Sequence, residues 1–187
     1  MGENISRITA ETGNNLLKLL SYNIQVGITT TRLRHYFTHM LGHVLPHAKS
    51  LENLDCIAAL ISDFDMVAIQ EADGGSIRSQ FINQVEYLAE HGAFPHWYQQ
   101  RNRNLGKFAQ HSNGLLSKHQ PTDITEYKLP GLIPGRGVMT VQYGSDDNPF
   151  FVLMLHLSLS RYARIRQLAF VSEIVNRYEH VVVMGDF

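Results

Sequence analysis

The pattern of apolar and polar residues divides the chain into short apolar runs and longer segments of helical periodicity. The apolar runs have the length of buried strands, and the longer segments place apolar side chains three or four residues apart, as on one face of a helix. Strands are expected near residues 16–26, 66–71, 94–100, 114–117, 138–143, 150–157 and 180–184, and helices near 50–61, 76–92 and 161–178. Because the first of these elements run strand, helix, strand, the pattern predicts an α/β fold.

Each of the three expected helices has an apolar stripe, which is formed by Leu54, Ile57, Ala58 and Ile61 in the helix at 50–61. Ser76 is a candidate cap for the helix at 76–92, and Gly92 is its candidate stop. The residues expected to face inward are Ile77, Phe81, Val85 and Leu88 in that helix, and Ile165, Leu168, Val171, Val175 and Tyr178 in the helix at 161–178.

The apolar run at 66–69 ends in Gln70 and Glu71 and then opens into the turn residues that begin with Asp73. A carboxylate at the end of a buried strand is held by a rigid element, and it suits a hard metal ion such as Mg²⁺, which prefers oxygen ligands. A solvated charge that ends an ordinary strand explains Glu71 equally well.

Polar residues also follow other apolar strands. Asn23, His156 and Asp186 each stand at or near such an end, and strand ends are where sites are built in open α/β sheets. Each has an ordinary explanation when taken singly. A histidine near the end of a buried strand, for example, is more often a satisfied core residue than a catalyst.

Two further polar residues precede strands. Asn113 stands just before a short apolar run, where it either hydrogen-bonds a ligand or satisfies a turn. Arg136 ends a loop rich in glycine and proline at 131–137. An arginine there suits a phosphate, or it braces the loop through its carbonyl groups.

Four histidines recur at every fourth position, namely His35, His39, His43 and His47. On a helix they would form one stripe, which invites a metal interpretation. Gly42 and Pro46 argue against a continuous helix, and no glutamate follows the first histidine as in zinc proteases. The pattern favours a surface or partly buried stripe, and a substrate-facing loop is the third possibility.

Composition narrows the class of protein. The chain has 187 residues, a net charge of −1, and a composition of 44% hydrophobic and 18% charged residues, which is ordinary for one globular domain. It lacks the basic excess of strong non-specific nucleic-acid binders.

Cys56 is the single cysteine and is expected in the core, so no intrachain disulfide forms and a cytoplasmic location is compatible. No apolar run approaches the roughly 20 residues of a membrane span, so no stable membrane insertion is expected, and no protein partner is evident. Residues 1–15 are expected to be a flexible, solvated tail.

Taken in order, the polar strand ends resemble the motifs of the endonuclease/exonuclease/phosphatase superfamily. The resemblance runs from about Leu16 to the last residue, and Leu155 stands where the family usually has threonine. The matching stretches are Ser21-Tyr22-Asn23-Ile24, Ile69-Gln70-Glu71, Asn113-Gly114-Leu115-Leu116-Ser117, Arg136-Gly137-Val138, His156-Leu157 and Gly185-Asp186-Phe187.

The resemblance implies a four-layered α-β-β-α sandwich, of which residues 16–187 form the N-terminal and larger part of a single domain. It also implies divalent-metal-dependent hydrolysis of a phosphoester. Glu71 would bind Mg²⁺ or Mn²⁺ with Asn23 beside it. His156 and Asp186 would act with Glu71 in catalysis, and Asn113 and Arg136 would shape the phosphate pocket.

The family continues after Gly-Asp-Phe with an asparagine, a further aspartate and a late Asp-His pair that activates the attacking water. The 187 residues do not include these groups, so the expectation is an incomplete sandwich without its C-terminal strands and an inactive or nearly inactive fragment. Three functions stay open. They are a nuclease, a phosphodiesterase or phosphatase acting on a lipid or small molecule, and a non-catalytic interaction module that keeps the fold.

Overall fold

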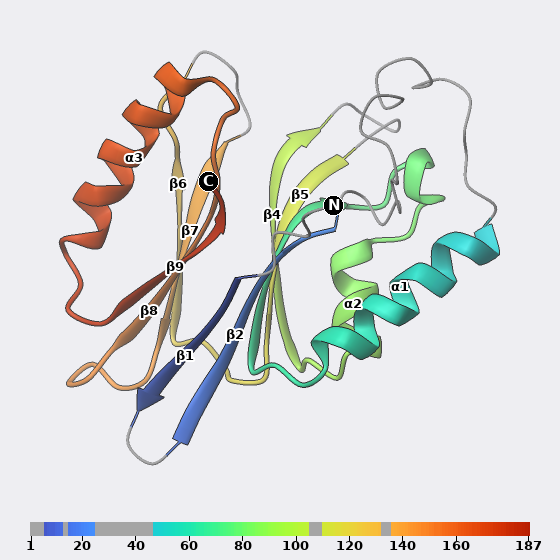
Figure 1. Cartoon of the computed structure of the whole chain (residues 1–187), viewed down its shortest axis with the longest axis horizontal. Helices are drawn as coiled ribbons and strands as arrows, with labels where there is room; N and C mark the ends of the chain where they lie inside the picture. The colour runs from blue at the N-terminus through green and yellow to red at the C-terminus, as the bar shows by residue number, and fades with distance from the viewer. Residues whose placement is uncertain (1–5, 13–14, 25–46, 105–109, 132–135) are drawn as a thin grey trace.

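Two β-sheets lie face to face in the computed structural model of the chain, with helices on the outer side of each sheet (Figure 1). The structure describes residues 6–12, 15–24, 47–104, 110–131 and 136–187. The layers follow the order α-β-β-α, so the predicted sandwich is confirmed. Residues 25–46, which include His35, His39 and His43, lie outside the described part, and His47 is described only as the first residue of a helix.

The first sheet has the strand order β1-β2-β3-β5-β4, and the second has the order β6-β7-β8-β9. The pairs β2–β3 and β8–β9 are parallel, and all other neighbours are antiparallel. The strands are β1 (Ser6–Thr12), β2 (Asn15–Asn23), β3 (Met66–Asp73), β4 (His96–Asn104), β5 (Gln110–Ser117), β6 (Asp123–Lys128), β7 (Gly137–Tyr143), β8 (Phe150–His156) and β9 (Val181–Asp186).

A helix connects the two strands of each parallel pair, as such pairs require. The helix α1 (His47–Ile61) lies between β2 and β3 in the chain, and α3 (Arg161–Val175) lies between β8 and β9. Together with α2 (Gln84–His91), α1 covers the outer face of the first sheet, while α3 covers the second (Figure 1). Among the described helices, none combines the length and apolar character that spanning a bilayer requires.

Strand alternation divides the apolar residues among three clusters. In β8, Val152 and Met154 face the other sheet, whereas Leu153 and Leu155 pack toward α3. The cluster between the sheets also contains Leu19, Met66, Ala68, Leu115, Met139, Val141 and Met184. A polar residue that continues the inner face of a strand therefore points between the two sheets.

For residues 6–12, the strand β1 replaces part of the flexible tail expected at 1–15. Residues Ser6–Thr12 pair antiparallel with β2, from Ser6 opposite Ser21 to Thr12 opposite Asn15. This pairing satisfies backbone groups along an edge of β2 that would otherwise face solvent. At the edge of the other sheet, β9 pairs with β8 alone within the described residues.

The helix expected at 76–92 is replaced by one 3₁₀ turn, Ile77–Ser79, and the shorter helix α2. Ser76 is not a helix cap, because its hydroxyl donates to Asp73 at 2.7 Å. Asn83 caps α2 instead by accepting a bond from the Val85 N–H, and Gly92 ends the helix as predicted. Ile77 and Phe81 consequently lie exposed rather than in the core.

The buried face of α3 also differs from the prediction. Ile165 and Leu168 are exposed, and the residues buried on this helix are Gln167, Val171 and Ile174. Hydrogen bonds to nearby loops allow a glutamine to occupy this face, as described below. Cys56 is exposed on α1 rather than a core residue, because Leu54, Ile57 and Ala58 take the buried face of that helix.

Candidate active site

The sheet topology gathers all six candidate residues at one edge of the sandwich. Asn23, Glu71, His156 and Asp186 lie at or near the carboxyl ends of β2, β3, β8 and β9. The strands β5 and β7 run antiparallel to β3 and β8, so their first residues lie at the same edge. Asn113 near the start of β5 and Arg136 just before β7 therefore belong to this edge as well.

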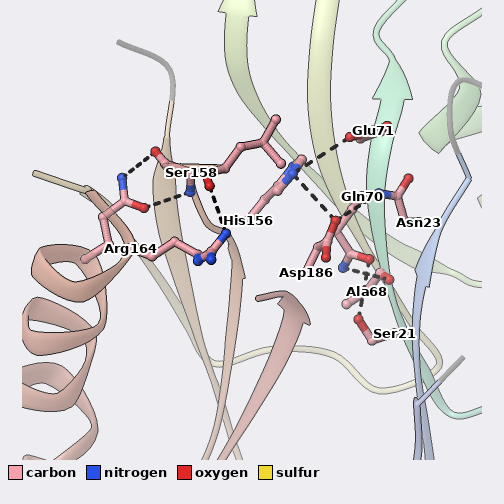
Figure 2. Close-up of polar contacts among 11 residues, drawn as sticks. Ser21, Asn23, Ala68, Gln70, Glu71, His156, Ser158, Arg164 and Asp186 are labelled. Carbon is pink, nitrogen blue, oxygen red and sulfur yellow. Dashed lines mark hydrogen bonds and ion pairs between the residues drawn. The ribbon is translucent and has the colours of Figure 1, made fainter. Parts of the chain in front are cut away.

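Four of these side chains meet between the sheets (Figure 2). The His156 Nε2 atom lies 3.8 Å from Glu71 Oε1 and 3.8 Å from Asp186 Oδ2. The Asn23 amide donates from Nδ2 to Asp186 Oδ2 at 3.1 Å. The site thus joins two residues of the first sheet to two of the second.

Simple alternation brings three of the four into the gap between the sheets. Asn23 continues the face of Leu19, His156 that of Met154, and Asp186 that of Met184, and all three leading residues belong to the cluster between the sheets. β2 and β8 need no irregularity to aim their polar ends at the site, whereas β9 has a positive φ of 147° at Gly185, just before Asp186.

Glu71 reaches the site by a different route. Alternation alone would place it on the face of Ile69, which packs toward the helices. The pairing of β3 with β5 shifts register between Ile69 and Ala72, and Glu71 has a positive φ of 56°. This β-bulge turns the carboxylate toward His156. A left-handed conformation at a non-glycine residue costs on the order of 1–3 kcal/mol, so the position stores strain.

Hydrogen bonds of Gln70 hold the carboxyl-terminal end of β3 in place. Its side chain is buried, donates to the Ala68 carbonyl at 3.1 Å and accepts a bond from the Ser21 hydroxyl at 3.4 Å. Its backbone carbonyl accepts from Ile24 N–H at 3.1 Å. These bonds tie the end of β2, which carries Asn23, to the end of β3.

The loop after Glu71 is organised by Asp73, a fully buried carboxylate. It accepts hydrogen bonds from the N–H groups of Gly75 (3.0 Å) and Ser76 (2.7 Å) and from the hydroxyls of Ser76 (2.7 Å) and Ser79 (2.9 Å). Burial of a charge is tolerable with this many donors. The sequence Asp-Gly-Gly-Ser carries the signal for such a turn, although we did not predict the carboxylate's role from it.

A glycine is required immediately before Asp186. Gly185 has a φ of +147°, and a Cβ atom there would lie 1.9 Å from the Leu155 carbonyl oxygen. Only glycine allows β9 to lie this close to β8 at the register that sets His156 beside Asp186.

Asn113 and Arg136 lie at the same edge as the four central residues. Asn113 is fully buried, and neither of its amide atoms has a hydrogen-bond partner among the residues that the structure describes. Arg136 is half-buried, and its backbone carbonyl accepts from Leu129 N–H at 3.0 Å. Their role toward a phosphate remains a prediction.

Glu71, His156 and Asp186 form a candidate metal centre. Each offers one ligand atom, and these atoms lie within 4.8 Å of one another. The two carboxylate side chains are about one third exposed, so water and substrate can reach them. Two carboxylates this close repel each other, and a cation between them relieves that repulsion, so the donor set fits a divalent ion that prefers oxygen ligands.

The sequence comparison agrees with the motifs at the strand ends. A family model described as "Endonuclease/Exonuclease/phosphatase family" matches residues 20–187. Among curated proteins, none matches the chain in sequence.

Solved structures share the fold. An endonuclease/exonuclease/phosphatase from Beutenbergia cavernae DSM 12333 is 19% identical, with a TM-score of 0.65 over 89% of this chain and 46% of that one. A mannosyl-6-phosphatase from Bacteroides thetaiotaomicron VPI-5482 is 14% identical, with a TM-score of 0.59 over 91% and 64%. TDP2 from D. rerio, complexed with single strand DNA product, is 18% identical, with a TM-score of 0.56 over 90% and 58%. The chain spans 46–64% of the length of these three structures.

Proposed function

The chain belongs to the endonuclease/exonuclease/phosphatase family, and we propose that it is a divalent-metal-dependent phosphoester hydrolase. The observation that carries the proposal is the convergence of Glu71, His156 and Asp186 within 4.8 Å at the open edge of the sandwich. Two carboxylates and an imidazole in this arrangement are suited to a hard cation and to a phosphate at the same time.

Glu71 would hold Mg²⁺ or Mn²⁺ together with Asp186 or Asn23. When bound, the ion neutralises charge on the phosphate oxygens and on the leaving group. The Asn23 amide fixes the Asp186 carboxylate by its 3.1 Å bond, so Asp186 can orient a water molecule or the phosphate. His156 would donate from Nε2 to a phosphate oxygen, and Asn113 and Arg136 would line the phosphate pocket. In-line displacement at phosphorus depends mainly on such positioning and electrostatics.

The substrate class is open, and the similar structures illustrate two of three candidates. One similar structure is named a mannosyl-6-phosphatase, and another was solved with a single strand DNA product. Their TM-scores of 0.59 and 0.56 are nearly equal, so the shared fold does not choose between a phosphomonoester and a nucleic-acid phosphodiester. Phosphodiester lipids remain a third substrate class.

Metal binding and turnover test the proposal separately. Mn²⁺ binding is measured by electron paramagnetic resonance, and hydrolysis is measured with bis(p-nitrophenyl) phosphate, a sugar phosphate and a single-stranded oligonucleotide. We expect Glu71→Gln to weaken Mn²⁺ binding by roughly tenfold or more and to abolish hydrolysis. Glu126→Gln is the control, because Glu126 is an exposed acid on β6 away from the site.

The outcomes distinguish the open functions. Mn²⁺ binding that depends on Glu71 without turnover of any substrate would favour the nearly inactive fragment or the interaction module. Mn²⁺ binding unchanged in Glu71→Gln would contradict the proposed metal centre.

A further inference from the structure

Gln167 is a buried glutamine on α3 that the proposed reaction does not use. Its side chain is 1% exposed, and it shares a helix face with Val171 and Ile174. An apolar residue would serve packing equally well, whereas a buried amide is costly unless it is hydrogen-bonded. The presence of an amide here therefore requires an explanation beyond packing.

The amide is saturated by two loops of the second sheet. Its Oε1 atom accepts from the Ser158 N–H at 2.9 Å. Its Nε2 atom donates to the Ser158 hydroxyl at 2.9 Å and to the Pro130 carbonyl at 3.2 Å. Both amide protons and the oxygen are thus used, and one side chain joins the loop after β8 to the loop before β7.

Both loops carry predicted site residues. Ser158 follows His156 and Leu157 in the chain and lies on the α3 side of His156 in Figure 2. Pro130 follows Leu129, whose N–H donates to the Arg136 carbonyl at 3.0 Å. Leu157 N–H donates to the Asp186 carbonyl at 3.0 Å. The two residues after β8 are therefore held by β9, at Leu157, and by Gln167, at Ser158.

We propose that Gln167 is a positioning residue that fixes the direction of His156 through Ser158 and the approach of Arg136 through Pro130. The proposal rests on the proposed function, because positioning matters only where His156 and Arg136 act on a phosphate. The His156 Nε2 atom lies 3.8 Å from each of two carboxylates, so a small displacement of the exit of β8 changes its reach toward a substrate. Displacements of about 1 Å can cost roughly a hundredfold in rate.

The test compares Gln167→Leu with Val171→Ala. Leucine keeps the approximate size of the side chain and removes all three hydrogen bonds, whereas Val171→Ala removes apolar packing on the same helix face and none of these hydrogen bonds. The first readout is the imidazole resonance of His156 in metal-free protein, assigned by its loss in His156→Asn. The second is kcat and KM for bis(p-nitrophenyl) phosphate with Mn²⁺.

We expect Gln167→Leu to shift or broaden the His156 resonance and to lower kcat about 10- to 100-fold, with KM and Mn²⁺ affinity little changed. Val171→Ala should lower the melting temperature while leaving the His156 resonance and kcat within about twofold of wild type. If Gln167→Leu does not fold, Ser158→Ala removes one of the three bonds and should give a smaller shift of the same resonance.

Equal effects of Gln167→Leu and Val171→Ala on the resonance and on kcat would overturn the proposal and leave Gln167 with a role in stability alone. Wild-type protein that hydrolyses none of the substrates would refute the proposed function for this chain. The His156 resonance would still decide the positioning claim, because it is recorded without metal or substrate.

Discussion

The loops after β3 and after β8 leave the same edge of the sandwich beside the same site, but they are held in different ways. The loop after β3 is held from within, because the Asp73 carboxylate accepts from groups no more than six residues away. The loop after β8 is held from outside by Gln167, an amide of the helix α3. The Asp73 N–H also donates to the Gln84 Oε1 atom of α2 at 2.8 Å, so both loops use a helix amide, but only the first loop adds a local network around a buried carboxylate.

The strands β3 and β8, which lead into these loops, also differ in the regularity of their backbone. β3 turns Glu71 toward the site by a bulge with a positive φ of 56°, and β8 presents His156 by ordinary alternation. The first sheet thus combines a strained backbone with a local charged network. The second sheet combines a regular strand with long-range neutral hydrogen bonds and one obligatory glycine. Strain at one side of a site therefore does not require strain at the other.

The largest effect is expected on the side of the second sheet. Gly185→Ala places a Cβ atom against the Leu155 carbonyl, where the available distance is 1.9 Å. We expect a loss of more than about 4 kcal/mol in the free energy of unfolding, or failure to fold, measured by urea denaturation. Gly131→Ala is the control, since a Cβ there comes no closer than 3.5 Å to a neighbour. Equal denaturation midpoints for the two variants would contradict the close approach of β8 and β9.

The next effect concerns the local network of the first sheet. Asp73→Asn keeps the shape of the side chain but replaces one acceptor oxygen by a donor that faces other donors. We expect a loss of about 2–3 kcal/mol in the free energy of unfolding, because a buried carboxylate with several donors forms strong hydrogen bonds. Asp146→Asn, at an exposed turn, should change stability little. A stability of Asp73→Asn equal to that of the control would show that the network contributes nothing.

The smallest expected effect is a gain in stability rather than a loss, and it tests the backbone strain at Glu71. Glu71→Asn and Glu71→Gln both remove the charge, but asparagine tolerates a left-handed backbone better than glutamine does. We expect Glu71→Asn to be about 1 kcal/mol more stable than Glu71→Gln in denaturant titrations, while both lose Mn²⁺ binding. If Glu71→Gln were the more stable of the two, the positive φ at this position would not be a source of strain.

The sequence predicts the direction of those site residues that follow regular strand alternation. Asn23, His156 and Asp186 stand on apolar strands whose alternation continues to the last residue, so their direction follows from the pattern. The sandwich followed from the order of motifs and the family they resemble. The bulge at Glu71 was not predicted, because the apolar run at 66–69 has no feature that signals an extra residue in the pairing.

Gln167 shows why apolar periodicity does not predict long-range hydrogen bonds. The prediction for α3 was right for Val171, which is buried, but wrong for Ile165 and Leu168, which are exposed. The actual buried face includes a glutamine because the Pro130 carbonyl, 37 residues away in the chain, accepts its amide proton. Such a partner is brought near only when the whole sheet has formed, and no local periodicity records it.

The hydrogen bond between Asn23 and Asp186 has a consequence for the order of events during synthesis. These residues are separated by 163 positions, and they belong to different sheets. Contacts of such long range form late, because the entropy of closing so large a loop must first be overcome. A nascent chain on the ribosome therefore carries no assembled site until β9 has emerged and docked. If the proposed metal centre binds a cation, that binding reports that these two sheets have docked, and an antibody or fluorescent probe specific for this edge would report the same event.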